Sequence, residues 1–245
     1  MKKTCVIMCI VAWVMLSCVA CGGKHAEGQL QSSVETNHQE NTEVSQAVSD
    51  TLAINKPEDN HLKCLVQIQT DVRLGSGILW DRQKDVWTFV TAAHVVEGAK
   101  QAEVCFVPEN KKYSARVYIV KGVDLAFLQV DVARLEDDIK DNYAMCISVD
   151  TEVRSGETVS AMGYSASGER KSYTGTVQEP WIYVEDFDNY MLLCEVEAEA
   201  GMSGGGVFTK DGEIAGIICG ENDAGQLAVL PTIVIEGEYG LFINY

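Results

Sequence analysis

The chain has 245 residues and a formal net charge of −17, with 36 acidic side chains against 19 basic ones. This charge argues against nucleic acid as a partner and against electrostatic binding to anionic lipid, because both are negative as well. Hydrophobic residues make up 47% of the chain, enough for a packed core, but they are unevenly distributed along it.

The first 20 residues have the pattern of a secretory signal peptide. Two lysines precede an apolar run, and small residues and cysteines come after it. The run is shorter than a membrane-spanning helix normally needs. Cys18 and Cys21 each come after a small residue, and this ending resembles a bacterial lipoprotein signal, in which such a cysteine is lipidated. We predict a lipoprotein signal over residues 1–20, with the lipid on Cys21 or alternatively on Cys18. An ordinary signal peptide is the other interpretation.

Residues 21–60 differ sharply in composition from the C-terminal three quarters of the chain. They include no aromatic residue and few large aliphatic ones. Such a stretch cannot bury enough apolar surface to offset the entropy lost on ordering. We predict a disordered polar tether with an average reach of about 30 to 40 Å. Together with the signal, it predicts a protein held outside the bacterial cell membrane by its lipid.

Residues 61–245 are long enough for one folded domain with a core. They contain short apolar or alternating runs divided by polar turns, which is typical of antiparallel barrels or a sandwich. A charged connection over residues 131–156, in which we predict a helical turn, separates two groups of six predicted strands. The predicted strands are 62–69, 75–80, 86–92, 103–107, 113–120 and 124–130, then 158–164, 171–177, 191–197, 206–208, 213–219 and 227–230.

Nine cysteines are divided between the signal and the domain. The domain has an odd number of them, so at least one thiol is unpaired unless it bonds between chains. No two domain cysteines have the CxxC spacing of a zinc or redox motif, and we expect no metal and no cofactor. The domain cysteines are Cys64, Cys105, Cys146, Cys194 and Cys219.

Three short blocks contain residue types suited to nucleophilic catalysis. His94 is the only histidine well inside the domain, and it comes directly after the apolar strand "VWTFVTA" and one further alanine. Asp124 opens the apolar strand "DLAFLQV", where a carboxylate needs a partner such as an imidazole N–H. Ser203 lies in the glycine-rich stretch "GMSGGG". A serine hydroxyl needs a base to act as a nucleophile, so these three residues form one candidate set.

The blocks "TAAHVV", "DLAFL" and "GMSGGGVF", in this order, resemble the signature blocks of the chymotrypsin-like serine peptidases. They are most similar to the bacterial HtrA/Deg-like branch, as are "GSGILW" and "VSAMGYSASGERKSYTGTV". The resemblance covers about residues 62–232. It implies an all-β fold of two six-stranded antiparallel barrels, the chymotrypsin-like double barrel, with the active site at their interface.

The resemblance also implies a role for each residue. Ser203 would attack the scissile carbonyl, His94 would take its proton, and Asp124 would hold the imidazole in the right tautomer. The backbone N–H groups of Gly201 and Ser203 would form the oxyanion hole. These roles imply protein or peptide substrates as partners.

The sequence departs from the family at two places. Met202, directly before the serine, cannot make the ion pair that an aspartate makes there in animal digestive members, so we expect no zymogen step of that kind. Since little more than "IVIEGEYGLFINY" comes after the last predicted strand, we also expect no PDZ domain of the kind that HtrA-like chains normally carry. This stretch also does not resemble the helix that closes many of the family's barrels.

The resemblance also implies a substrate pocket formed by Glu197, Cys219, Gly220 and Glu221. The two glutamates would favour a basic residue before the cut, but the stretch around Glu197 is equally typical of a strand with its charges in solvent. Two functions stay open. The first is an active, lipid-anchored serine endopeptidase. The alternative is an inactive peptidase-fold lipoprotein that binds peptides or acts as a scaffold.

Overall fold

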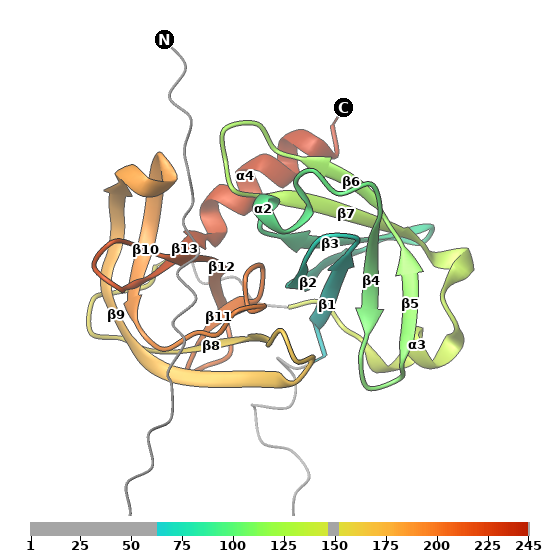
Figure 1. The fold of residues 1–245 in the computed structure, drawn as a ribbon, viewed down its shortest axis with the longest axis horizontal. Helices are drawn as coiled ribbons and strands as arrows, with labels where there is room; N and C mark the ends of the chain where they lie inside the picture. The colour runs from blue at the N-terminus through green and yellow to red at the C-terminus, as the bar shows by residue number, and fades with distance from the viewer. Residues whose placement is uncertain (1–62, 147–151, 245) are drawn as a thin grey trace, which may run out of the picture. The chain divides into compact units, whose positions relative to one another are not determined.

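The structure is a computed structural model that describes residues 63–146 and 152–244. The predicted signal peptide, its two candidate lipidation cysteines and the tether lie outside these residues. The described residues form two antiparallel β-sheets and a C-terminal helix (Figure 1). No helix within the described ranges is long and apolar enough to cross a membrane.

The first sheet has seven strands in the order β5-β4-β1-β2-β3-β7-β6. All of its neighbouring pairs are antiparallel, and the register runs Leu65↔Ile78 in β1–β2 and Thr91↔Ala126 in β3–β7. The strands are β1 (Leu65–Thr70), β2 (Leu74–Arg82), β3 (Val86–Thr91), β4 (Ala102–Phe106), β5 (Lys111–Ser114), β6 (Arg116–Ile119) and β7 (Ala126–Asp131).

The second sheet is a closed barrel of six strands in the order β10-β13-β12-β11-β8-β9. Antiparallel pairing of β9 with β10 closes this order into a ring, so the barrel has no edge strand. The strands are β8 (Thr158–Tyr164), β9 (Arg170–Val184), β10 (Asn189–Glu195), β11 (Gly206–Thr209), β12 (Ile214–Glu221) and β13 (Leu227–Pro231).

The helices are short and lie between strands, except for the last. They are α2 (Ala93–Val96), η1 (Val132–Arg134), α3 (Asp137–Asn142), η2 (Glu185–Phe187) and α4 (Thr232–Phe242). α3 confirms the helical turn predicted within the charged connection. Asp138, one of the two acidic residues in the first turn of α3, forms an ion pair with Lys111 of β5. This ion pair joins the charged connection to the edge of the first sheet.

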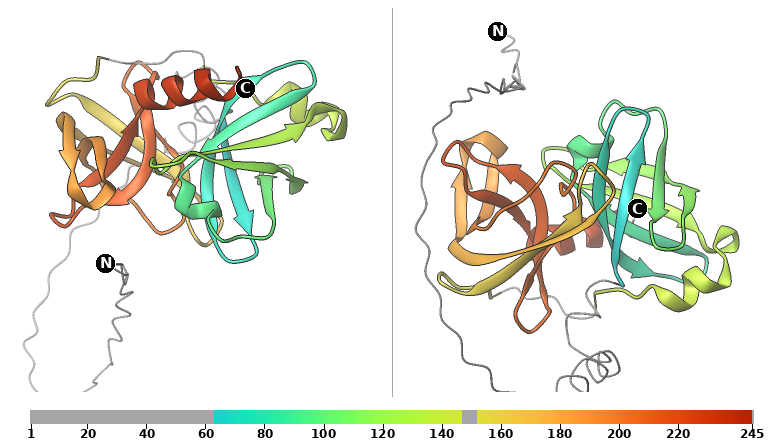
Figure 2. Two further views of the ribbon diagram at one scale, coloured as in Figure 1. Left: turned by 90° about the horizontal axis from the view of Figure 1, so that it is seen from above. Right: turned by 60° about the horizontal axis from the view of Figure 1, so that its bottom comes forward.

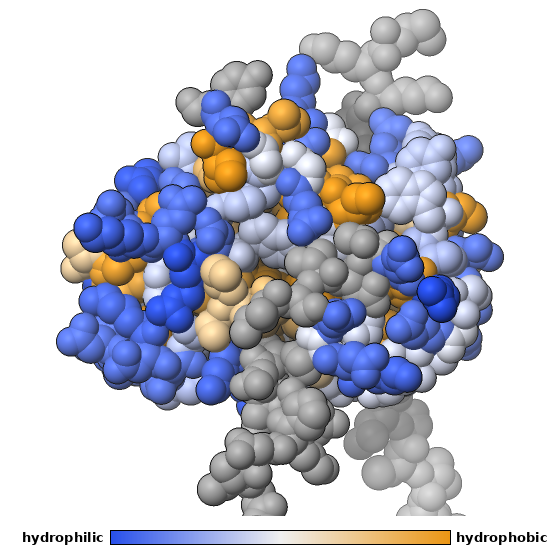
Figure 3. All heavy atoms as spheres, turned by 180° about the vertical axis from the view of Figure 1, so that it is seen from behind, coloured by the Kyte–Doolittle hydropathy of each residue, from blue (hydrophilic) through white to orange (hydrophobic). Residues whose placement is uncertain are grey.

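The core is built by the inward faces of the strands. Phe89, Phe106 and Phe127 are fully buried in the first sheet, and Phe208 in the second. Burying one such side chain contributes on the order of 2 to 3 kcal/mol, which accounts for the strand pattern visible in the sequence. Outward positions are mostly polar, and on the face shown in Figure 3 hydrophobic side chains occur in separate patches among hydrophilic ones.

The all-β double-barrel architecture predicted from the resemblance is confirmed, with two differences in detail. The run predicted as one strand over 113–120 is divided at Ala115, whose N–H donates to Ala102 O at 2.9 Å. This division gives the first half seven strands in a curled sheet instead of six in a barrel. The second difference is β9, which runs for 15 residues and is much longer than predicted.

The expectation that the C-terminal stretch lacks the closing helix is wrong. Residues Thr232–Phe242 form α4, which starts directly after β13 of the barrel and lies against the first sheet (Figures 1 and 2). Phe242 stacks on Phe127 of β7 with a ring-centroid distance of 4.8 Å, and Tyr239 packs on the same ring at 5.5 Å. Two glycines and several β-branched residues give this stretch a low helix propensity. The stretch is helical nevertheless, because one face of the helix packs on the domain.

Candidate active site

His94 lies on α2, shortly after β3 ends at Thr91. The helix is only one turn long, so its position depends on side-chain contacts. The guanidinium of Arg73 donates from Nη1 to His94 O at 2.6 Å and to Glu97 O at 3.0 Å. Val95 and Val96 of the same turn are buried. These contacts fix the imidazole at the end of a core strand.

Asp124 contacts His94 through both carboxylate oxygens. Oδ1 accepts from the His94 backbone N–H at 2.9 Å, and Oδ2 lies 2.8 Å from ring Nδ1. An ionised carboxylate can only accept, so the proton must lie on Nδ1. Nε2 is then left as the acceptor, and the His94 side chain is 41% exposed. The pair is therefore arranged as an oriented base facing solvent.

The pKa of the Asp124 carboxyl is lowered from its ordinary value. Burial is the largest single influence and raises the pKa, but the hydrogen bonds and charge of His94 together outweigh it. The thiol of Cys219 also lies nearby, 3.9 Å from Asp124 O. Asp124 is thus ionised at neutral pH although its side chain is only 21% exposed.

Ser203 lies in the turn between β10 and β11 of the barrel, and this turn packs directly on the segments around His94. The N–H of Ser76 in β2 donates to Ser203 O at 2.8 Å. A Cβ on Gly75 would lie 2.5 Å from Val95 Cγ1 and 3.2 Å from Ser203 O, so only a glycine fits between α2 and the serine turn. The structure therefore brings the three predicted residues to one place between the two sheets.

Ser203 and the imidazole of His94 do not form a hydrogen bond in the structure. Within residues 63–146 and 152–244, neither Ser203 Oγ nor His94 Nε2 has a hydrogen-bond partner. The Asp124–His94 half of the arrangement is thus formed in the structure. The role of Ser203 as the nucleophile stays a prediction.

The backbone around Ser203 has two N–H groups that make no internal hydrogen bond. Gly201 has a φ of +99°, a conformation that side chains resist. The carbonyl of Ala200 accepts from the Ala166 N–H at 2.7 Å, which turns the Gly201 N–H of the same peptide unit to the opposite side. The N–H groups of Gly201 and Ser203 have no acceptor among the described residues. Two unpaired donors in one turn suit the binding of an oxyanion.

Ser76 is a residue whose contribution sequence reasoning missed. Its hydroxyl is fully buried, donates to Gly201 O at 2.9 Å and accepts from the Tyr164 N–H at 2.7 Å. Its own carbonyl accepts from Thr91 Oγ1 at 2.6 Å. One serine of the first sheet thus connects β3, β8 and the serine turn. The sequence feature that could have indicated Ser76 is its position as a small polar residue between two glycines, at the start of an apolar strand.

Met202 occupies the position where the sequence departs from the digestive peptidases. Its side chain is completely buried in the core of the barrel, and its Sδ lies 3.3 Å from the Glu199 N–H. The methionine thus anchors the turn by apolar burial, where an aspartate would need an ion-pair partner.

The predicted substrate-pocket residues have different surroundings. Glu197 and Glu221 are exposed, and Gly220 has a φ of +152°. Cys219 is buried behind Asp124, and this burial raises its thiol pKa well above the ordinary value. The assignment of these four residues to a substrate pocket stays a prediction.

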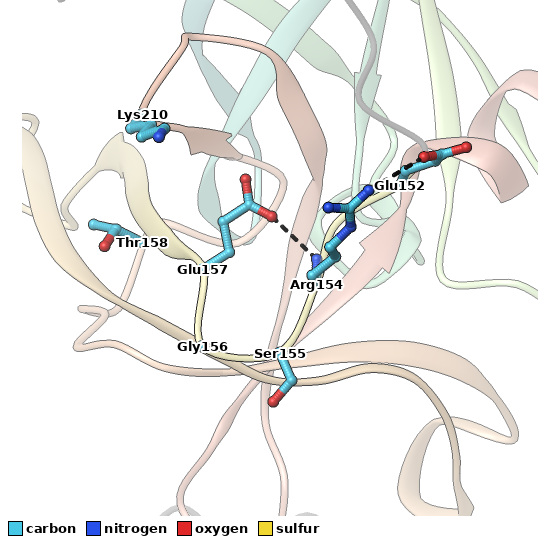
Figure 4. Close-up of a pocket in the computed structure, with 7 residues that line it drawn as sticks. All are labelled: Glu152, Arg154, Ser155, Gly156, Glu157, Thr158 and Lys210. Atoms are coloured by element: carbon cyan, nitrogen blue, oxygen red, sulfur yellow. Dashed lines mark hydrogen bonds and ion pairs between the residues drawn. The ribbon is translucent and has the colours of Figure 1, made fainter.

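A separate hollow of about 640 Å³ lies at the turn before β8. Figure 4 shows its lining, which includes Glu152, Arg154, Glu157 and Lys210 and none of the predicted site residues. The Arg154 side chain pairs with Glu152 at 3.7 Å, and the Arg154 N–H donates to the Glu157 carboxylate at 3.1 Å. The hollow lies apart from the predicted catalytic residues.

Comparison with known proteins agrees with this geometry. Residues 75–217 match the family described as "Trypsin-like peptidase domain". The chain belongs to this family. The matched range includes His94, Asp124 and Ser203, and it covers more than half of the chain. A search of the curated proteins finds no significant match.

Solved structures with a similar fold include two of Rv3671c and one of a serine endoprotease. The inactive serine-to-alanine mutant of Rv3671c from M. tuberculosis H37Rv has a TM-score of 0.61 and 19% identity, over 78% of this chain and 92% of that one. An inactive form of the Rv3671c protease has a TM-score of 0.56 and 21% identity, over 73% and 87%. The serine endoprotease from Yersinia pestis has a TM-score of 0.61 and 19% identity, over 78% and 67%. At these identities the likeness concerns the fold.

Proposed function

We propose that this protein is a serine endopeptidase that hydrolyses peptide bonds through Ser203, His94 and Asp124. The observation that carries the proposal is the double hydrogen bond of Asp124 to the ring and the backbone of His94. A carboxylate that holds an imidazole in one tautomer is typical of a catalytic histidine and is not required by a histidine at the protein surface. With Nδ1 held by Asp124, Nε2 would be the base that takes the proton of Ser203.

In the proposed reaction Ser203 Oγ attacks the scissile carbonyl carbon and transfers its proton to His94 Nε2. The imidazolium is stabilised by the Asp124 carboxylate, which stays ionised. His94 then donates the proton to the leaving amine, and an acyl-enzyme remains on Ser203. Water, deprotonated by the same imidazole, releases the acid and restores the hydroxyl.

The negative charge that develops on the carbonyl oxygen would be bound by the N–H groups of Gly201 and Ser203. Both donors are unpaired within the described part of the chain, so no internal bond has to break before they bind an oxyanion. Each such donor contributes about 3 kcal/mol to the transition state. The Ala166–Ala200 hydrogen bond fixes the orientation of the Gly201 donor before substrate binds.

The test is labelling of the full-length chain with a fluorophosphonate probe, followed by cleavage of a denatured protein substrate. We expect labelling of the wild type, none of Ser203→Ala, and strongly reduced labelling of His94→Ala. Ser160→Ala is the matched control, because this serine lies on β8 with its hydroxyl bonded to Thr174 Oγ1 at 3.3 Å. Ser160→Ala should be labelled like the wild type.

A folded wild-type chain that takes no label and cleaves no peptide would contradict the proposal. The inactive peptide-binding or scaffolding module would then be the better interpretation. A fluorescent peptide library, measured by polarisation, would reveal such binding without turnover. The same library, read by mass spectrometry, tests the preference for a basic residue before the cut that Glu197 and Glu221 would confer.

We further propose that the protein acts outside the cytoplasmic membrane, attached by lipid on Cys21. The support is the signal-like N-terminal sequence and the polar tether that succeeds it. Metabolic labelling with an alkyne fatty acid should mark the wild type and Cys18→Ala but not Cys21→Ala. The reverse pattern would assign the lipid to Cys18, and no incorporation in any variant would exclude the anchor.

A further inference from the structure

Two cysteines far apart in the sequence meet beside the first sheet. Cys64 directly precedes β1, and Cys146 lies at the end of the segment after α3. Their Sγ atoms are 2.7 Å apart. A disulfide bond is about 2.0 Å long, so a movement of about 0.7 Å would bring the sulfurs to bonding distance.

The backbone on both sides of the pair is held in place. The Ala144 N–H donates to Lys63 O at 3.2 Å, and the Leu79 N–H donates to Cys64 O at 2.7 Å. Arg82 binds the other side, from Nη1 to Tyr143 O at 2.7 Å and from its backbone N–H to Met145 Sδ at 3.1 Å. The sulfurs therefore meet because the two segments are packed together, and not through a chance rotamer.

The other described thiols have no such neighbour. Cys105 Sγ lies 3.9 Å from Gln69 Oε1, and Cys219 Sγ lies 3.9 Å from Asp124 O. Cys194 is fully buried in the barrel. Among the described residues, a contact between two cysteine sulfurs is found only for Cys64 and Cys146. This contact pairs two of the domain's five cysteines and leaves three as thiols.

We propose that Cys64 and Cys146 form an intrachain disulfide once the chain has left the cytoplasm. The inference rests on the export proposed above and is independent of peptidase activity. The oxidant is a disulfide donor, either a small-molecule disulfide or the disulfide of an oxidoreductase. The two protein thiols are oxidised to one S–S bond, and the donor disulfide is reduced to two thiols, which receive both protons and both electrons.

The surroundings indicate an order for the two exchange steps. Cys146 is half-buried, and Cys64 is buried. The Cys146 thiolate would attack the donor disulfide and release one donor thiol. The Cys64 thiolate would then attack the Cys146 sulfur and release the second. Burial raises the pKa of the Cys64 thiol, so the second step in the folded chain should become faster as pH rises.

The cross-link would stabilise the half of the domain that carries the base. It would tie the start of β1 to the connection and enclose all seven strands of the first sheet, with His94 and Asp124. Closing so long a loop removes much of the entropy of the unfolded chain. We expect reduction to lower the Tm of the domain by about 5 to 15 °C.

The test is a peptide map of the full-length chain, expressed with its own signal in a bacterium with an oxidising extracytoplasmic compartment. Cells are quenched with acid and N-ethylmaleimide, and the protein is digested with trypsin without reduction. Cleavage after Lys63, Arg73, Lys140 and Arg154 isolates the two cysteines on peptides 64–73 and 141–154. We expect these peptides as one linked species that separates on reduction.

Recovery of both peptides as maleimide adducts would overturn the proposal. Thermal unfolding gives a second readout: Cys146→Ser should have a lowered Tm that dithiothreitol no longer changes. Cys105→Ser is the control, because it removes a buried thiol without removing the cross-link, and its Tm should still fall on reduction. An equal effect of dithiothreitol on wild type and Cys146→Ser would also count against the disulfide. Fluorophosphonate labelling reports the active site separately, so failure of the peptidase assignment would leave this result unaffected.

Discussion

The hydroxyl of Ser76 donates a hydrogen bond to the carbonyl oxygen of Gly201 at 2.9 Å, across 125 residues of sequence and from one sheet to the other. The Ser76 hydroxyl oxygen also accepts the Tyr164 N–H at 2.7 Å. A single buried hydroxyl in the first sheet thus holds both the start of the serine turn and the end of β8. The shape of the proposed oxyanion hole therefore depends on the other half of the molecule.

Ser76→Ala should reduce turnover more than substrate binding. The change leaves the Tyr164 N–H and the Gly201 carbonyl without this partner, which costs about 2 kcal/mol of stability. The loosened turn should lower kcat by about 10- to 100-fold with a small change in KM, because the oxyanion donors act in the transition state. Kinetics and urea unfolding of the same preparation measure both effects. The substitution Ser160→Ala should change neither, and an unchanged kcat in Ser76→Ala would remove the link between this contact and catalysis.

Gly201→Ala should abolish most activity because of both strain and collision. The residue has a φ of +99°, and an added Cβ would lie 2.6 Å from Ala166 N and from Ser165 C. The turn would have to shift, and misplacing an oxyanion donor lowers kcat by about 100-fold or more. Fluorophosphonate labelling rates measure the change.

Gly225→Ala is the matched control for this prediction. Gly225 also has a positive φ, +75°, but an added Cβ would meet nothing within 4 Å. It should lose about 1 kcal/mol of stability and retain its labelling rate. Equal losses of activity in both variants would show that backbone strain alone, and not the oxyanion geometry, is responsible.

Asp124→Asn should lower kcat by about 10³- to 10⁴-fold, because an amide no longer enforces the proton on His94 Nδ1. It should also flatten the acid dependence of stability. A carboxyl whose folded pKa is lowered contributes stability that is fully present above its unfolded pKa of about 3.9. That contribution is lost as the pH falls through the lower folded pKa. Urea unfolding at pH 7, 5 and 3 should show a larger acid loss in the wild type than in the variant.

A parallel acid loss in the two proteins would contradict this interpretation of the Asp124 pKa. Asp131→Asn is a suitable comparison, since it removes an exposed ion pair with Arg116 at 2.9 Å on the edge of the first sheet. Such surface pairs contribute about 0 to 1 kcal/mol. This variant should be fully active.

Ile235→Ala in α4 should destabilise the domain by about 2 to 4 kcal/mol, because Ile235 is fully buried and its removal leaves a cavity. The nearby Leu241→Ala should stay within about 0.5 kcal/mol of the wild type, since Leu241 is 58% exposed. Urea unfolding compares the two. Equal stabilities would mean that α4 does not hold the sheets together, against its contacts with Phe127.

The sequence by itself determined most of the strands, their division into two groups and the candidate residues. A strand alternates its side chains between two faces, so each run of buried residues is visible locally. The three blocks around His94, Asp124 and Ser203 are each confined to a few residues, and their order along the chain is enough to indicate the family. The meeting of Asp124 with His94, 30 residues apart, is predicted in this way, and the structure shows it.

Only the tertiary structure decided the contacts that join distant segments. Ser76 and Ala166 hold the serine turn from other strands and loops, and nothing in their immediate neighbours marks those partners. α4 escapes sequence-based prediction because its helical state comes from packing on Phe127 and not from its own propensity. The approach of Cys64 to Cys146 has the same origin. Local pattern reports which face of an element is buried, whereas the partner it is buried against is fixed only when the whole chain folds.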